Sequence, residues 1–172
     1  ERAPTNASGP TVELMDSGLG QDSSAAMAMI VVTNDNPASV GEFVTASVNF
    51  LDEQGRIIAT KEQVEMFSWE GQELVLPVQL YLPEFPGVTV AAIDPVVTIS
   101  NYGSSGRAEE PLPVLETDEI YSNTWGEVAT SFMFANETEK DLNSMRVGVV
   151  CYDDAGQING GTSTYPNAPA GR

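Results

Sequence analysis

From Val12 to Asn34 the chain reads VELMDSGLGQDSSAAMAMIVVTN, and from Val114 to Asn136 it reads VLETDEIYSNTWGEVATSFMFAN. These two stretches match at a constant offset of 102 residues. The match resumes at an offset of 101, where SVNFLDEQGRI (Ser47 to Ile57) lies over GVVCYDDAGQI (Gly148 to Ile158). Each copy of an internal repeat is one structural unit, so the recurrence predicts two similar domains in tandem.

The first copy contains short strand-like stretches separated by turn residues. From Phe43 to Leu51, the apolar residues Ala46, Val48 and Phe50 alternate with polar ones, which is the pattern of a strand with one buried face. Further strands are expected at Val12–Met15, Ala26–Thr33, Arg56–Thr60, Leu74–Leu82 and Val88–Ile99, with a polar connection at Ser17–Ser24. About seven short strands in roughly 90 residues, with no convincing helix, predict an all-β fold of immunoglobulin-like antiparallel sandwiches.

Two prolines interrupt the expected strands of the first copy. Pro77 lies within Leu74–Leu82 and Pro95 within Val88–Ile99. Proline has no N–H to donate to a strand ladder, so Pro77 favours an edge strand or a bulge.

The repeat also predicts how the chain is divided. We expect a flexible leader at residues 1–10, a first sandwich at 11–100, a linker rich in Gly, Ser and Pro at 101–113, and a second sandwich at 114–172. The second copy reaches only the equivalent of Gly71, and the first copy holds two more strands beyond that point. Three explanations stay open: the protein continues beyond Arg172, a strand at Thr162–Tyr165 closes a reduced sandwich, or a partner donates the missing strand.

Composition excludes several classes of function. The chain has 25 acidic and 7 basic residues, and its net charge of −18 repels nucleic acids and anionic membranes. Histidine is absent, which removes the commonest general base and transition-metal ligand. A single cysteine allows neither an intramolecular disulfide nor a cysteine-based zinc site. No catalytic motif, cofactor motif or membrane span is present, so we expect no enzyme, no cofactor, and no catalytic or metal residue to name.

Several residues recur in the repeat or stand out by type. Asp52 and Asp153 occupy equivalent turns, where aspartate accepts hydrogen bonds from amides two residues on; calcium binding with Glu53 or Asp154 is the alternative. Asn34 and Asn136 are assigned to turns for the same reason. Cys151 aligns with Phe50 and is expected to face inward as an inert apolar residue. Trp69 and Trp125 are expected to cap a sandwich, or alternatively to stack on a sugar or peptide.

At the turns Leu51-Asp52-x-x-Gly55 and Tyr152-Asp153-x-x-Gly156 the chain resembles the FxLYD-type immunoglobulin-like domains of bacterial and archaeal surface lipoproteins and secreted proteins. Val149-Val150-Cys151-Tyr152-Asp153 matches best, and Leu51 departs from the aromatic residue of the motif. The resemblance implies a fold and an extracellular or cell-surface location, and it carries no catalytic activity.

We therefore expect a non-catalytic secreted or surface-anchored binding or adhesion module, such as the ectodomain of a bacterial lipoprotein, that contacts a protein partner through strand edges or loops. An extracellular calcium- or solute-binding protein is one alternative. The other is an accessory domain of an enzyme that lies outside this chain.

Overall fold

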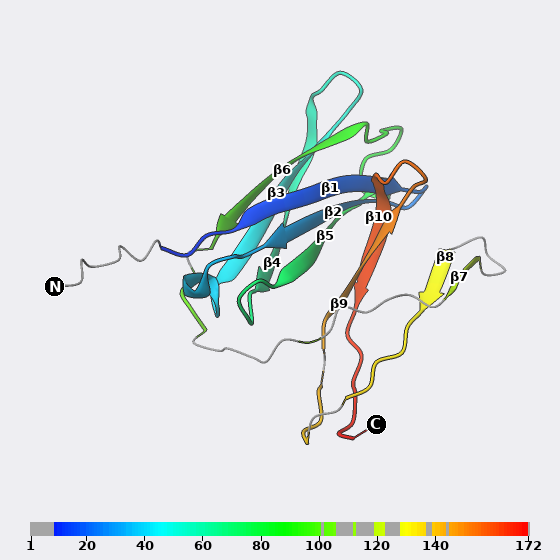
Figure 1. The fold of residues 1–172 in the computed structure, drawn as a ribbon. Coiled ribbons are helices and arrows are strands. Elements are labelled where there is room, and N and C mark those ends of the chain that lie inside the picture. Colours follow the sequence, from blue (N-terminus) through cyan, green and yellow to red (C-terminus); the bar gives the residue numbers. More distant parts are fainter. Residues whose placement is uncertain are drawn as a thin grey trace. The chain divides into compact units, whose positions relative to one another are not determined.

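The computed structural model describes residues 9–100, 102–105, 112, 119–122, 128–136, 139–143 and 145–171, and within them the fold is all-β (Figure 1). The strands form antiparallel sheets, and short 3-10 turns are the helical elements of the described residues. Their contacts divide the chain into two compact units, residues 1–111 with 148–163, and residues 112–147 with 164–172. The boundaries expected from the repeat, 11–100 and 114–172, stay a prediction.

The first sheet contains β1 (Glu13–Gln21), β2 (Ala25–Thr33) and β5 (Glu73–Tyr81), in the order β1-β2-β5. The expected strand at Ala26–Thr33 is confirmed as β2. The expected connection at Ser17–Ser24 is wrong over most of its length, because β1 continues to Gln21. Pairing with β2 overrides the weak strand propensity of this polar, glycine-containing segment, and an irregularity between Leu14 and Asp16 shifts its register.

The second sheet contains β3 (Phe43–Leu51), β4 (Ile57–Met66) and β6 (Ala92–Ile99), in the order β4-β3-β6. The predicted bounds of β3 are confirmed, whereas β4 runs beyond the expected Thr60. Pro77 in β5 and Pro95 in β6 both lie in edge strands, as the missing N–H of proline requires. Six strands therefore occupy residues 13–99 instead of about seven.

One apolar core lies between these two sheets. From β3 it takes Val44, Ala46, Val48 and Phe50, all fully buried, which is the alternation that the sequence predicts. The first sheet contributes Ala26, Ala28, Ile30 and Val32 from β2 and Leu76, Val78 and Leu80 from β5. Burial of apolar area at this scale is the main favourable term in folding.

A hairpin from the second copy belongs to the first unit for most of its length. It consists of β9 (Val147–Tyr152) and β10 (Ile158–Thr164), which pair with each other. Ile158 packs with Met29 and Val31, which lie on the opposite face of β2 from the main core. Strand β2 is therefore buried on both faces, which accounts for its nearly continuous apolar sequence.

The second unit contains β7 (Glu119–Ser122) and β8 (Val128–Ser131), which pair antiparallel. Leu142 and Ala168 exchange backbone hydrogen bonds of 2.9 and 2.8 Å, and the Met145 N–H donates to the Pro166 carbonyl. Most of the segment Thr162–Tyr165, proposed as a closing strand in one of the three alternatives, lies in β10, which ends at Thr164. Among the described residues, no helix is long and apolar enough to span a membrane.

Candidate functional site

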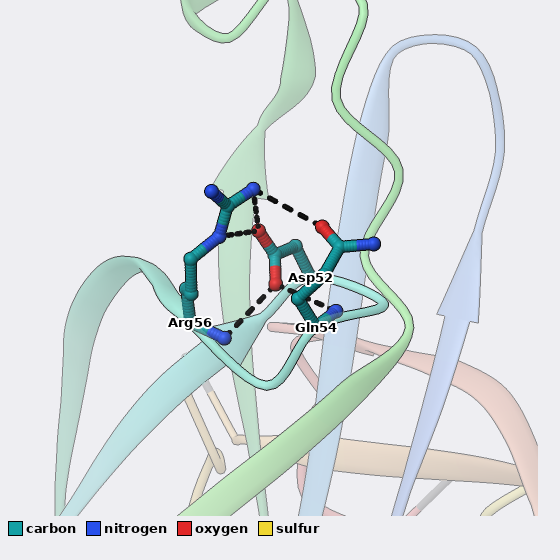
Figure 2. A network of polar contacts seen from close by, with 3 residues as sticks. All are labelled: Asp52, Gln54 and Arg56. Atoms are coloured by element: carbon teal, nitrogen blue, oxygen red, sulfur yellow. Dashed lines mark hydrogen bonds and ion pairs between the residues drawn. The ribbon is translucent and has the colours of Figure 1, made fainter.

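Both oxygens of the Asp52 carboxylate accept hydrogen bonds from residues of its own turn (Figure 2). Oδ1 accepts hydrogen bonds from the backbone N–H groups of Gln54 and Arg56, both at 2.9 Å. Oδ2 accepts from Nε of Arg56 at 2.7 Å and forms an ion pair with the same guanidinium group. The Arg56 backbone N–H first, and its guanidinium second, lower the pKa of Asp52 below its ordinary value of 3.8.

Asp153 repeats this turn in the second copy. Its Oδ1 accepts from the backbone N–H groups of Ala155 and Gln157 at 2.9 Å each. Gly55 and Gly156 have φ angles of 73° and 75°, a left-handed conformation that glycine adopts without steric cost. The turn-forming role predicted for both aspartates is confirmed. Among the described residues, no three Asp, Glu, Cys or His side chains are grouped as a metal site.

Asn34 and Asn136 are buried, each 1 % exposed, and each closes an equivalent loop. The Asn34 side-chain amide donates to the Trp69 backbone carbonyl at 3.2 Å. The backbone carbonyl of Asn34 accepts a hydrogen bond from the Gly71 N–H at 2.8 Å. In the second copy, the side-chain amide of Asn136 donates to the Lys140 and Ala168 backbone carbonyls, both at 2.8 Å. The backbone carbonyl of Asn136 accepts a hydrogen bond from the Gly171 N–H at 3.0 Å. The prediction of turn chemistry missed these long-range bridges, although the recurrence of glycine at 71 and 171 was their signal.

Cys151 and Trp69 are both half-buried. Phe50 is fully buried, so Cys151 does not reproduce the environment of its repeat equivalent, and the expectation of an inward-facing core position is wrong. The neighbouring Val150 is the β9 residue that packs against the Met29 cluster, which places Cys151 on the other face of the strand. The Trp69 carbonyl accepts the Asn34 bond, consistent with a capping position. Trp125 lies outside the described residues.

An open depression of about 570 Å³ lies at one end of the first two sheets. It is formed by the turn between β1 and β2 and by the segment that follows β5, which begins with a 3-10 turn at Leu82–Glu84. Its lining residues are Gln21, Asp22, Ser23, Leu82, Pro83, Phe85, Pro86, Gly87, Val88 and Thr89. Because these residues come from two distant segments, the sequence alone did not single them out.

Hydrogen bonds hold both walls of this depression. The Gln21 side chain donates to the Val90 carbonyl at 2.7 Å and accepts from the Val90 N–H at 3.3 Å, which ties the second segment to β1. Phe85 N–H donates to Leu82, and Val88 N–H donates to Phe85. A surface held in one conformation loses little conformational entropy when it binds a partner.

The rim of the depression carries a negative charge. The Asp22 carboxylate accepts from the Ser24 N–H at 2.6 Å, the Ser24 hydroxyl at 2.8 Å and the Ala25 N–H at 2.9 Å. The Ser24 hydroxyl, followed by the two backbone N–H groups, lowers the pKa of Asp22 below 3.8, so the group is ionised at neutral pH. The depression thus joins apolar surface from Leu82, Phe85 and Val88 to one fixed carboxylate.

No protein-family model matches the chain, and searches of curated proteins and of solved structures found no significant match.

Proposed function

We propose that the chain is a non-catalytic, secreted or surface-anchored binding module, built from two tandem immunoglobulin-like sandwiches of the FxLYD type. It contacts a protein partner through the depression at the end of the first sandwich. The observation that carries this proposal is the depression itself, where hydrogen-bonded loops present Leu82, Phe85 and Val88 next to the carboxylate of Asp22. Loops held by a rigid scaffold are the usual binding surfaces of sandwich domains.

Three further observations support a sandwich module with this role. Each of the two three-stranded sheets contributes one face to a shared core, and the loops at the sheet ends lie outside this core. The exposed Pro83 and Pro86 and the half-buried Phe85 offer rigid apolar contact area. The strong negative charge of the chain favours a partner with a basic surface.

The alternative of calcium binding at the repeated turns has less support. Calcium requires six to eight oxygen ligands, and both carboxylate oxygens of Asp52 are already engaged by donors of its own turn.

The test compares capture of proteins by the immobilised chain and by two variants. Proteins from the extracellular and cell-surface fraction of the cells that make the chain are passed over the wild type, Phe85→Ser and Tyr102→Ser. Tyr102 is the matched control: it is an aromatic residue, 73 % exposed, and it packs against Phe43 at the other end of β3. Circular dichroism checks that each variant is folded.

We expect a retained protein that Phe85→Ser loses and Tyr102→Ser keeps, and we expect proteases added to intact cells to cleave the chain. Equal capture by the wild type and Phe85→Ser would refute the depression as the contact surface. A chain that intact cells protect from protease would refute the extracellular location.

A further inference from the structure

The β9 strand is equivalent to β3, yet within the described parts of the chain β3 has two neighbouring strands and β9 has one. The equivalence extends to hydrogen bonds: Asp52 N–H donates to the Arg56 carbonyl at 3.0 Å, and Asp153 N–H donates to the Gln157 carbonyl at 2.9 Å. In the first copy β3 lies between β4 and β6. Among the described residues, β9 pairs with β10 alone.

The other edges of the first two sheets carry features that hinder the addition of a strand. Pro77 lies in β5 and Pro95 in β6, and the register of β1 is interrupted between Leu14 and Asp16. The remaining edge strand, β4, carries Lys61, Glu62 and Glu65. Prolines, bulges and charges are the usual protection of an edge whose backbone groups would otherwise pair with another chain.

The prolines and charges of these edges do not occur in β9. Its sequence is VGVVCY, without proline or charge, and in this respect it resembles the interior strand β3, FVTASVNFL. One face is already supported, because Val150 packs against the Met29 cluster and an added Cβ at Gly148 would lie 2.7 Å from Cβ of Val75. The strand is therefore held in place, and within the part of the chain that the structure describes its other edge has no partner strand.

We infer that the open edge of β9 binds an extended polypeptide segment as an antiparallel strand, in the way that β3 binds β6. In that pairing Val44 lies opposite Ile99 and Leu51 lies opposite Ala92. Transferred to β9 by the repeat, the N-terminal end of the incoming strand lies opposite Tyr152. The strand has apolar residues at alternate positions, as the inward-facing residues of a half-buried strand require.

Charge specifies the incoming segment further. The exposed Asp153 and Asp154 follow Tyr152 directly, so they flank the N-terminal end of the incoming strand. The whole chain adds a net charge of −18. A segment with Lys or Arg just before its strand is therefore the occupant that β9 favours. This surface includes none of the residues that line the loop-end depression, so its test is independent of the proposed contact there.

The experiment adds synthetic peptides to the full chain and follows amide hydrogen exchange. The main peptide has eleven residues that alternate between apolar and polar, without proline or acidic residues, and two lysines at its N-terminus. Three controls carry the lysines at the C-terminus, a scrambled sequence, or N-methyl groups at alternate residues, which remove ladder donors. We expect the main peptide to slow exchange at residues 147–152 at least several-fold. The C-terminal lysine peptide should bind more weakly, with the difference reduced at about 1 M salt, where screening is strong.

Protection of β9 that the scrambled and N-methylated peptides do not produce would support the inference. It would be overturned by an absence of protection at about 1 mM main peptide, the weak end of specific affinity. Equal protection by the scrambled peptide would overturn it as well. Concentration-dependent protection of β9 without any peptide would show that a second copy of the chain occupies this edge, and would also overturn it.

Discussion

Asp52 contributes to its turn through charge as well as geometry. Its carboxylate accepts hydrogen bonds from two backbone N–H groups and from Nε of Arg56. An uncharged carboxyl group would accept these hydrogen bonds less strongly. The Arg56 side chain is 75 % exposed, so solvent weakens the ion pair itself, and the Arg56 backbone N–H is the largest single cause of the lowered pKa of Asp52. The sequence predicted this role, because an Asx turn is a local structure that Asp and Gly specify within a few residues.

We predict that Asp52→Asn lowers the melting temperature at neutral pH. The pKa of Asp52 is depressed in the folded state, so its contribution to stability is fully present above the unfolded value of 3.8 and is lost as the pH falls through the lower folded value. The difference in melting temperature between the wild type and Asp52→Asn should therefore vanish in acid. Thermal unfolding by circular dichroism at pH 7, 4 and 2 checks this, with Glu53→Gln as the neighbouring control. A pH-independent difference would contradict it.

The asparagines act over longer distances than the aspartates. Asn34 and Asn136 each satisfy backbone carbonyl groups of a distant segment in a buried setting, where an unpaired polar group costs roughly 1–3 kcal/mol. Sequence reasoning placed them in turns, but it did not find the segments that they bridge. Those partners are set by the folding of the whole unit.

At the scale of elements, the glycines of β1 explain how the β9–β10 hairpin covers the outer face of the first sheet. Added Cβ atoms at Gly18 and Gly20 would contact the backbone of Ile158 and Asn159 in β10. Gly18 lies beside Met29 in the sheet register, on the face where Met29 packs with Ile158. The two glycines therefore allow β10 to approach β1 closely. The sequence predicts a polar connection here instead, because a missing side chain leaves no hydrophobic pattern.

We predict that Gly18→Ala destabilises the first unit by about 1–3 kcal/mol, the usual cost of inserting atoms into a packed contact. The added Cβ would lie 2.7 Å from Cγ2 of Ile158. Gly160→Ala is the matched control, since nothing lies within 4 Å of a Cβ there. Urea unfolding of both variants measures the difference. Equal stability of the two variants would mean that β10 does not pack against β1 in solution.

At the scale of the whole molecule, the repeat produces similar elements in different surroundings. Ile57 and Ile158 are equivalent in the sequence, but Ile57 is 61 % exposed and Ile158 is 6 % exposed. The same contrast holds for the strands before them: β3 has polar Ser47 and Asn49 on the face where β9 has Gly148 and Val150. These substitutions are what allow β9 to pack on a sheet, and they were a sequence signal for that packing.

We predict that Ile158→Ala lowers the free energy of unfolding by about 2–5 kcal/mol, while Ile57→Ala changes it by less than about 0.5 kcal/mol. The reason is that only Ile158 fills a closed apolar contact, with Met29 and Val31. Urea denaturation of both variants tests this, and dye binding to newly exposed apolar surface reports whether the face of β2 is uncovered. Similar effects at both positions would show that the two hairpins have the same environment.

The sequence by itself determined the local structure of this protein. The repeat, the bounds of β3, the edge position of Pro77 and the Asp-x-x-Gly turns all follow from patterns within a few residues or from direct recurrence. Only the tertiary structure decided that β2 is buried on both faces, that Ile158 differs from Ile57, and that β1 extends through its glycines. The physical reason is that periodicity reports which residues avoid water, whereas the segment that covers them is chosen by contacts between distant parts of the chain.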